Sequence, residues 1–265
     1  MKTVALIPAY NASKTITGIV DRIPREFIDE IIVVDDGSID DTYERLKELE
    51  DITLIKHEEN LGYGAAQLSL YKAALTVNAD YTVILHADGG HYPEEIPVML
   101  APLMGQEPAD VVVGSRTRGI MNGAKPLMRS KLLGAAFRGS MPAYKFIANI
   151  ILTAFQNTCY GTRYRSFHSG FRACRRDALL KIDLEKLTSW YLFDTQFLLE
   201  VHNNGLRIVE VPVGTFYDED AGSSAPVLRY GVRIVLFSLK YTFRRVFSWK
   251  YRFGRSKSDV PESSV

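Results

Sequence analysis

The chain has 265 residues, 46% of them hydrophobic, which is enough for one large domain with a buried core. Its two cysteines, Cys159 and Cys174, lie far apart, which excludes a disulfide framework and a cysteine-based zinc site. The net charge of +1 hides a strong segregation, because residues 1–110 carry a net charge of −12 while residues 111–176 hold 12 basic and no acidic residues. We therefore expect the basic part to meet an anionic partner, with nucleic acid, a membrane surface and a phosphorylated substrate all open.

The first 114 residues alternate between strand-like and helix-like patterns. Strands are predicted at residues 3–8, 30–34, 52–56, 81–85 and 110–114, and helices from Ser13, from Asp41 or Thr42 to Leu49, over 64–76 and from Pro93. Strict alternation predicts an α/β fold with a mostly parallel sheet and helices on both faces. Ligands of such sheets bind beyond the carboxyl ends of the strands. The polar segments that follow the first four strands are PAYN, DDGS, HEENLGYG and HADGGH.

The second half is less regular. Helices are predicted at residues 144–159, 193–203 and 227–253, with a strand at residues 207–212 and a loop with some helix over 114–141. The start of the chain reads as a strand and not as a signal peptide, and no stretch is long and apolar enough to span a bilayer. These features favour a cytoplasmic location, with contact to the inner face of the cell membrane left open.

Two adjacent acids, Asp35 and Asp36, stand at the end of the second predicted strand. Neighbouring carboxylates are unfavourable there unless something binds them, and one can accept hydrogen bonds from a base N–H or from ribose hydroxyls. Gly37 permits a sharp turn after them. The structural alternative, an Asx turn in which Ser38 or Asp40 caps the next helix, fits the motif equally well.

A second polar cluster, from His86 to His91, follows the fourth predicted strand. A carboxylate at a strand end, such as Asp88 between small residues, can reach a hard cation and the diphosphate that the cation bridges. His86 and His91 are candidates for further ligands. The alternative is a glycine turn in which Asp88 caps the helix that begins at Pro93.

Taken in order along the chain, these segments resemble family 2 glycosyltransferases. The segments that carry the resemblance, within residues 3–217, are PAYN, VVDDGSIDDT, ENLGYGAA, HADGGHYPE, VVGSR, HSGFRA and FDTQFL. The chain is similar to the branch that includes dolichyl-phosphate mannose synthases and bacterial relatives. The resemblance implies a GT-A fold, a nucleotide-sugar donor and inversion at the anomeric carbon.

The resemblance also implies roles for single residues. Those implied to bind the nucleotide are Pro8, Ala9 and Tyr10 in the base pocket, Asp36 on the base or ribose, and Asn60 and Gly62, which complete the pocket. Asp88 matches the second acid of the DxD motif of the family, which holds a divalent metal, Mn²⁺ or Mg²⁺, on the donor diphosphate. His86 replaces the first acid of that motif. Imidazole suits Mn²⁺ better than Mg²⁺, and the alternative is that His86 packs and does not ligate.

Asp194 matches the position at which many family members carry a catalytic acidic residue. An attacking hydroxyl loses its proton in an inverting displacement, and a positioned carboxylate can take it. The alternative is that Asp194 caps the helix predicted over residues 193–203. An acceptor that is already an ionised lipid phosphate needs no base, and such an acceptor would favour the interpretation of Asp194 as a helix cap.

Three cations of the basic half are candidates for phosphate contacts. Arg116 follows a predicted strand and should face the crevice, Lys145 begins the helix predicted at 144–159, and Arg172 follows the segment HSGF. Such cations stabilise a departing diphosphate or bind an acceptor phosphate. In the polyprenyl-phosphate branch, equivalents of Arg116 and of a residue near Lys145 meet the lipid phosphate. The alternative for any one of them is a solvated surface charge.

We predict a GT-A domain over residues 1–220, a basic amphipathic helical extension over 221–254 and a disordered tail over 255–265. The extension mixes aromatic residues with cations and holds no acid, which favours peripheral contact with an anionic membrane over simple packing on the body.

Three other functions fit less well. A dehydrogenase is disfavoured because Gln67 stands at the third glycine position of its fingerprint, a metal hydrolase leaves PAYN and DDGS without a role, and no nucleic-acid-binding module is present. The remaining alternative is a catalytically inactive relative that binds nucleotide or acts as a scaffold, and the His86 replacement is its best support.

Overall fold

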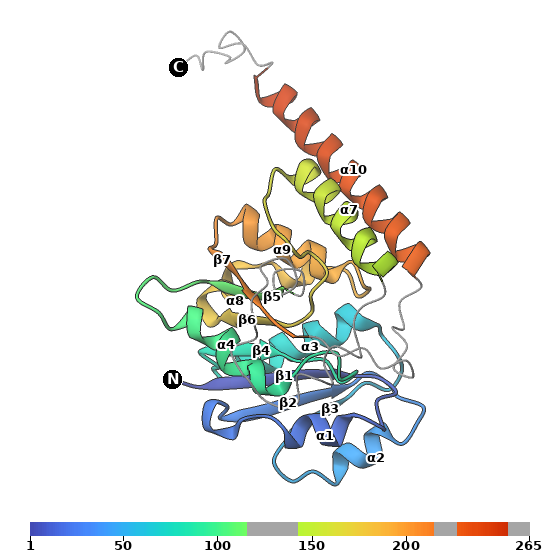
Figure 1. Ribbon diagram of the computed structural model, residues 1–265, viewed down its shortest axis with the longest axis vertical. Helices are drawn as coiled ribbons and strands as arrows, with labels where there is room; N and C mark the ends of the chain where they lie inside the picture. Colours follow the sequence, from blue (N-terminus) through green and yellow to red (C-terminus); the bar gives the residue numbers. More distant parts are fainter. Residues whose placement is uncertain (116–142, 215–226, 254–265) are drawn as a thin grey trace, which may run out of the picture.

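The computed structural model describes residues 1–115, 143–214 and 227–253, and within them a single seven-stranded sheet with helices on both faces (Figure 1). The strand order is β3-β2-β1-β4-β6-β5-β7. The strands are β1 (Thr3–Ala9), β2 (Glu30–Asp35), β3 (Thr53–Lys56), β4 (Tyr81–Ile84), β5 (Val111–Ser115), β6 (Arg172–Arg175) and β7 (Ile208–Pro212). The predicted mostly parallel α/β sheet is confirmed.

The one antiparallel member of the sheet, β6, lies between β4 and β5. It is four residues long, begins and ends with arginine, and has no apolar run, so the sequence pattern missed it. The other neighbouring strands run parallel, which brings the carboxyl ends of β1, β2, β3 and β4 to one edge of the sheet. That edge is where the polar segments follow the strands.

Most of the predicted helices form where the apolar spacing placed them. The helices are α1 (Ile16–Asp21), α2 (Thr42–Lys47), α3 (Tyr63–Thr76), α4 (Ile96–Leu100), α7 (Ala143–Tyr160), α8 (Arg176–Lys181), α9 (Phe193–Asn203) and α10 (Val227–Phe253). Pro93 begins the short 3₁₀ helix η2 (Pro93–Glu95), which leads into α4. The prediction that Ser13 caps the first helix is wrong, because that helix begins three residues later, after Thr15.

The buried side chains form one hydrophobic cluster on each face of the sheet. Along β1, Val4 and Leu6 belong to one cluster and Ala5 and Ile7 to the other, as the alternation of a strand requires. A strand buried on both faces reads as a continuous apolar run, which is what residues 3–9 show. This fully buried centre fixes the strand ends, and with them the loops that carry the polar segments.

The last helix, α10, packs along α7, and the two lie side by side beyond one end of the sheet (Figure 1). The Thr242 hydroxyl donates to the Cys159 carbonyl over 3.1 Å, and the Tyr160 and Tyr241 rings meet edge to face at 5.2 Å. None of the helices within the described residues combines the length and the apolar character needed to cross a bilayer. Residues 255–265, predicted to be a disordered tail, lie outside the described residues.

Candidate active site

The first loop at the carboxyl edge of the sheet follows β1. Pro8 and Ala9 are the last residues of the strand and are buried, whereas Tyr10 is 43% exposed. Asn11 connects this loop to the next one through two hydrogen bonds of 2.9 Å. Its side-chain oxygen accepts from the backbone amide of Ile39, and its backbone amide donates to the Ser38 hydroxyl. The predicted base pocket therefore has Tyr10 as its accessible wall.

Asp36 is buried and holds the loop that follows β3. One carboxylate oxygen accepts from the Leu61 amide at 3.0 Å and from His57 Nδ1 at 2.7 Å, and the other accepts from the Gly62 amide at 2.9 Å. These bonds occupy the carboxylate, so the structure makes Asp36 a residue that positions the Asn60–Gly62 turn. Sequence reasoning missed His57, because its contact with Asp36 forms only when β2 and β3 are paired.

The neighbouring Asp35 is fully buried, and neither of its carboxylate oxygens has a hydrogen-bond partner within the described part of the chain. Buried carboxylates are normally hydrogen-bonded, because an unpaired one loses its hydration without compensation. Gly37 closes the turn after the pair with φ of +66°, and a Cβ there would collide with the backbone of Glu59 and Asn60. The orphaned carboxylate marks this turn as a place where a donor of hydrogen bonds is required.

Asp88 follows β4, and its side chain is exposed. One carboxylate oxygen accepts from the Gly90 amide over 2.8 Å, so the predicted turn is present, and the exposed carboxylate lies at the carboxyl edge. The Thr15 hydroxyl donates to the Ala87 carbonyl over 2.6 Å and holds the turn against α1. Asp88 is thus an accessible carboxylate in an ordered turn, as a metal site at this edge needs.

The two histidines of the same segment are placed differently. His91 is buried against Phe171, with ring centroids 5.0 Å apart, and its role as a metal ligand stays a prediction. His86 is partly buried and stacks on Tyr63, with centroids 5.3 Å apart and planes 11° from parallel. A Cβ at position 170 would overlap the His86 ring, so Gly170 leaves the space in which the imidazole lies.

Asp194 is 5% exposed and lies at the centre of a buried polar network. It pairs with Arg172 over 2.7 Å and accepts a hydrogen bond from the Tyr63 hydroxyl over 2.9 Å. The helix α9 begins at Phe193 after Leu192, so the interpretation of Asp194 as its N-cap is wrong. Tyr63 also lies 3.2 Å from His86 Nε2, which connects the network to the segment that holds Asp88.

Arg172 is 0% exposed, so its guanidinium lies inside the protein, and its predicted contact with a phosphate stays a prediction. Burial opposes its charge, but the attraction of Asp194 and of the neighbouring acidic groups prevails, and the pKa of Arg172 lies above its ordinary value. Its guanidinium also bonds to Gln67 and lies over the Phe197 ring. The arginine therefore acts inside the protein as the counter-ion of Asp194.

The sequence model of "Glycosyl transferase family 2" matches residues 4–182 of the chain, which is more than half of its length. The chain belongs to the family 2 glycosyltransferases. It is 30% identical over 245 residues to a UDP-N-acetylglucosamine–dolichyl-phosphate N-acetylglucosaminyltransferase of Methanococcus voltae, covering 86% of this chain and 91% of the relative. It is 29% identical over 230 residues to a polyprenol monophosphomannose synthase of Mycolicibacterium smegmatis, covering 84% of this chain and 80% of the relative.

Solved structures support the fold of this glycosyltransferase. The glucosyl-3-phosphoglycerate synthase of Mycobacterium tuberculosis, in complex with Mn²⁺, UDP and glucosyl-3-phosphoglycerate, matches with a TM-score of 0.59 and 20% identity. The match covers 98% of this chain and 82% of the synthase. The fold is the GT-A fold, as the sequence resemblance implied. At this level of identity the likeness shows the fold alone.

The side chains of this glycosyltransferase that could ligate a metal fit an ion whose coordination shell is completed by the substrate. Within the residues that the structure describes, no three histidine, cysteine or acidic side chains gather as a metal cluster. Asp88 offers an exposed carboxylate, and His86 lies two residues away. Divalent cations in phosphate-transfer sites are commonly held by one or two protein carboxylates and complete their shell with substrate phosphate and water. The donor set is compatible with that arrangement.

Two of the predicted phosphate contacts cannot be placed. Arg116 lies outside the described residues, and Lys145 lies in α7 at a position where the side chain is outside them as well. Both therefore stay predictions. The described residues that meet at the carboxyl edge are Tyr10, Asp35, Asn60, Asp88 and His86.

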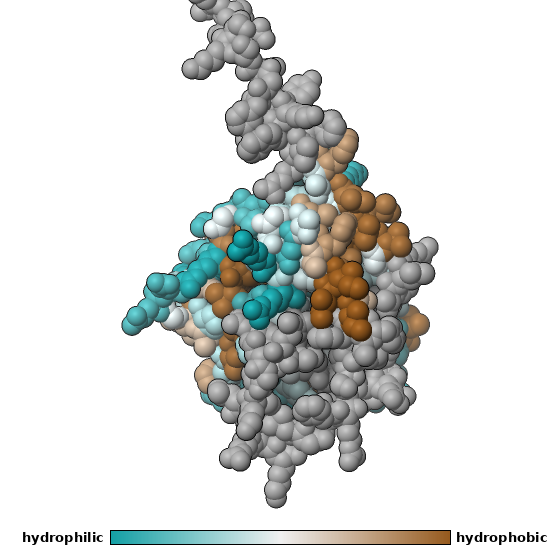
Figure 2. All heavy atoms as spheres, turned by 45° about the horizontal axis from the view of Figure 1, so that its top comes forward, coloured by the Kyte–Doolittle hydropathy of each residue, from teal (hydrophilic) through white to brown (hydrophobic). Residues whose placement is uncertain are grey.

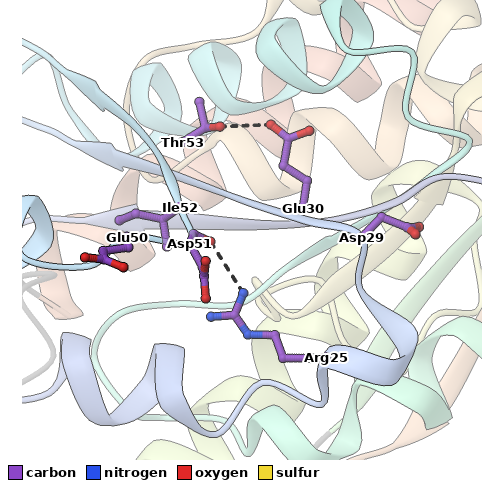
Figure 3. A pocket seen from close by; sticks show the side chains of 7 residues that line it. All are labelled: Arg25, Asp29, Glu30, Glu50, Asp51, Ile52 and Thr53. Carbon is purple, nitrogen blue, oxygen red and sulfur yellow. Dashed lines mark hydrogen bonds between the residues drawn. The ribbon is translucent and has the colours of Figure 1, made fainter.

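A pocket with a volume of about 400 Å³ lies at the other edge of the sheet (Figure 3). Its walls carry four acids and Arg25, and they come from the amino ends of β2 and β3. Thr53 donates to Glu30 over 2.9 Å, and Glu30 also pairs with Lys2 over 2.7 Å. Because ligands of this sheet type bind at the carboxyl ends, this pocket is not the transfer site.

Glu95 gives a testable effect of pH on stability. Both of its carboxylate oxygens accept from the Gly214 amide, at 2.9 and 3.0 Å, and burial raises its pKa to about 7. The folded chain therefore binds this proton more tightly than the unfolded chain, and the contribution to stability is lost as the pH rises from about 4.5 to about 7. We expect Glu95→Gln to raise the free energy of unfolding by ~2 kcal/mol at about pH 8 and to leave it unchanged near pH 4. Urea unfolding at both pH values checks this, and an equal effect at the two would contradict it.

Proposed function

We propose that the chain transfers a sugar, with inversion, from a nucleotide-sugar donor to a polyprenyl phosphate. The named relatives act on dolichyl phosphate or make a polyprenol monophosphate sugar, which supports this acceptor class. Another relative, 28% identical over 231 residues, is an undecaprenyl-phosphate mannosyltransferase of Micrococcus luteus. The observation that carries the proposal lies in the protein itself and concerns Asp194.

Asp194 is poorly placed to act as a general base. A base must reach the acceptor proton, but this carboxylate is buried and is engaged by Arg172, Tyr63 and Gln67. Taking a proton would also leave the Arg172 cation buried without its counter-ion, which is strongly unfavourable. An acceptor phosphate is ionised before it attacks and needs no base. We therefore assign Asp194 a positioning role, which favours a phosphate acceptor over a hydroxyl acceptor.

Tyr63 is the means by which Asp194 acts on the site. Burial and then the Asp194 charge raise the pKa of Tyr63 well above its ordinary value, so its hydroxyl keeps its proton. A carboxylate accepts and cannot donate, so this hydroxyl donates to Asp194 and its lone pair faces His86 Nε2. The pair Tyr63 and Asp194 thereby fixes the ring of His86 next to Asp88.

On this proposal the donor lies across the carboxyl edge, with the nucleoside between Tyr10 and the turn at Asp35 and the diphosphate near Asp88. Asp88 and His86 would hold a divalent metal, Mn²⁺ or Mg²⁺, which supplies positive charge for the departing diphosphate. The sugar and the base of the donor remain to be assigned by a panel of nucleotide sugars.

The acceptor class is tested by comparing a polyprenyl phosphate with the corresponding polyprenol. We expect transfer to the phosphate with one donor class and no detectable transfer to the alcohol, because Asp194, the base predicted for a hydroxyl, is engaged by Arg172 and Tyr63. Product formation is followed by chromatography of a radiolabelled sugar. Equal transfer to the alcohol would contradict the acceptor assignment.

The second candidate function is a catalytically inactive relative that binds nucleotide. The observation in its favour is His86, which stands where the family has an acid. The two functions differ in turnover, so binding of a nucleoside diphosphate with Mn²⁺ but no transfer to any phosphate or glycan acceptor would establish the inactive version.

A further inference from the structure

The packing of α10 on α7 divides the side chains of α10 into an inner and an outer set. Ile234, Ser238 and Tyr241 face inward, and Ser238 bonds to the Tyr160 hydroxyl of α7. The outer set includes Leu236, which is 62% exposed. Its large apolar members, each more than half exposed, are Val232, Leu236, Leu239 and Phe243. Their spacing of three to four residues places them on one stripe of the helix.

The neighbouring helix adds a second apolar stripe. Ile151 of α7 is 64% exposed, and Ile147 and Ile150 are also exposed at helical spacing. Because α7 and α10 lie side by side, the two stripes belong to adjacent elements (Figure 1). Figure 2 shows hydrophobic surface gathered in a band on this part of the molecule. We call the seven exposed apolar residues of the two helices the two-helix face.

The charged side chains that the structure describes on α7 and α10 are all positive. Arg233, Lys240 and Arg244 are exposed on α10 next to the apolar stripe. Neither α7 nor α10 contains an acidic residue anywhere in its sequence. An exposed apolar surface flanked by cations matches the interface of an anionic bilayer, which accepts both kinds of side chain.

We propose that the two-helix face rests on the surface of a bilayer that contains anionic lipids. A second copy of the chain is the other obvious occupant, but it would bring the cations of two α10 helices together without acids to neutralise them. The proposal rests on the proposed function in one respect, since a polyprenyl phosphate is presented by such a bilayer.

The structure changes which residues make the contact. Tyr230, Phe237 and Tyr241, which the sequence pattern assigned to the membrane, lie at least partly buried, and Tyr241 donates to Asn203 over 2.9 Å. The exposed surface is mostly aliphatic, and nearly half of it comes from α7. Removing α10 alone would therefore also disturb the packing of α7, so point substitutions on both helices are the sharper test.

The two-helix face is also connected to the candidate active site. Tyr230, in the first turn of α10, meets Tyr191 edge to face at 6.3 Å. Tyr191 in turn stacks on Tyr63 at 5.3 Å, and Tyr63 stacks on His86. The helix that faces the bilayer thus begins at the wall of the site, which suits an acceptor whose phosphate lies at the membrane surface.

The test is co-sedimentation of the full chain with vesicles of phosphatidylcholine, with and without phosphatidylglycerol. Ile151→Asp combined with Leu236→Asp is expected to lower the partition coefficient at least tenfold. The matched control is Leu180→Asp on α8, since Leu180 is 60% exposed but lies outside the two-helix face. We expect this control to bind vesicles as the unchanged chain does.

A second variant tests the charges separately. Replacing Arg233, Lys240 and Arg244 with glutamine is expected to reduce binding about fivefold per cation on vesicles with phosphatidylglycerol and to remove the preference for them. Unchanged binding by the Ile151 and Leu236 variant would overturn the proposal. The proposal would also be overturned if the unchanged chain did not bind vesicles and formed a dimer in light scattering that this variant dissociates. Hydrolysis of the donor without lipid should be equal in all variants, so loss of vesicle binding is distinguishable from loss of the proposed activity.

Discussion

Asp194→Ala is expected to lower the free energy of unfolding by about 3–5 kcal/mol. The substitution leaves the Arg172 guanidinium fully buried without the carboxylate that lies 2.7 Å from it. An uncompensated buried charge is far more unfavourable than the loss of one neutral hydrogen bond, which is worth about 1 kcal/mol. Urea unfolding followed by circular dichroism measures the change.

The chain supplies a matched control for this prediction. Arg175 and Asp177 form a second arginine–aspartate pair at 3.8 Å, but its aspartate side chain is 71% exposed. Asp177→Ala should change the free energy of unfolding by less than about 1 kcal/mol, because solvent screens such a pair. Combining Asp194→Ala with Arg172→Met should recover much of the lost stability, since the buried cation is then removed. Equal small effects at Asp177 and Asp194 would contradict the assignment of the buried pair.

Asp88→Ala is expected to lower the rate of sugar transfer by about 10²–10³-fold without loss of stability. Removing one group that stabilises charge in a transition state typically has an effect of this size. The side chain is exposed and its one described bond, to the Gly90 amide, lies in a surface turn, so the fold should not depend on it. The transfer rate is measured with Mn²⁺ at saturation, and the midpoint of thermal unfolding is measured in parallel.

The control for Asp88 lies at the opposite edge of the sheet. Asp51 is also exposed, and it lines the pocket at the amino ends of β2 and β3. Asp51→Ala should leave the transfer rate unchanged. A similar loss of activity in both variants would show that the effect is general, and it would remove the reason for placing the donor at the carboxyl edge.

The centre of the sheet was accessible from the sequence because β1, β2 and β5 are buried on both faces. Their apolar runs, such as residues 4–8 and 31–34, are bounded by turn residues. The strand β6 was missed because Arg172 and Arg175 at its ends look like surface residues. Nothing in a local pattern shows that an arginine is neutralised by an aspartate 22 positions further along the chain.

The sequence predicted the segments of the candidate site, but it did not predict the hydrogen bonds of their side chains. Asp36 was expected to meet the nucleotide, yet it is bonded to the loop that follows β3, and its neighbour Asp35 has the carboxylate without a partner. The pairing of β2 with β3 decides which of the two adjacent acids faces the loop. A short sequence motif does not contain this information. Similarly, the space that Gly170 leaves for His86 depends on two segments that are far apart in the sequence.

The composition of the extension over residues 221–254 indicates a membrane as partner, but it does not show which side chains make the contact. Its aromatic residues suggested a membrane surface, but Tyr230 and Tyr241 pack inward against other elements. Among the described side chains of α10, Tyr230, Phe237 and Tyr241 lie at least partly buried, and the exposed apolar ones are largely aliphatic. Helical spacing alone gives the stripes and does not say which stripe packs inward.

In the proposed function, the exposed carboxylate after β4 holds the cation on which the donor diphosphate departs. This role is measured by the release of nucleoside diphosphate from a panel of UDP-sugars and GDP-sugars, with and without Mn²⁺, by the unchanged chain and by Asp88→Ala. We expect slow, Mn²⁺-dependent release from one donor class by the unchanged chain and none by the variant. Release at the same rate by both proteins would contradict it.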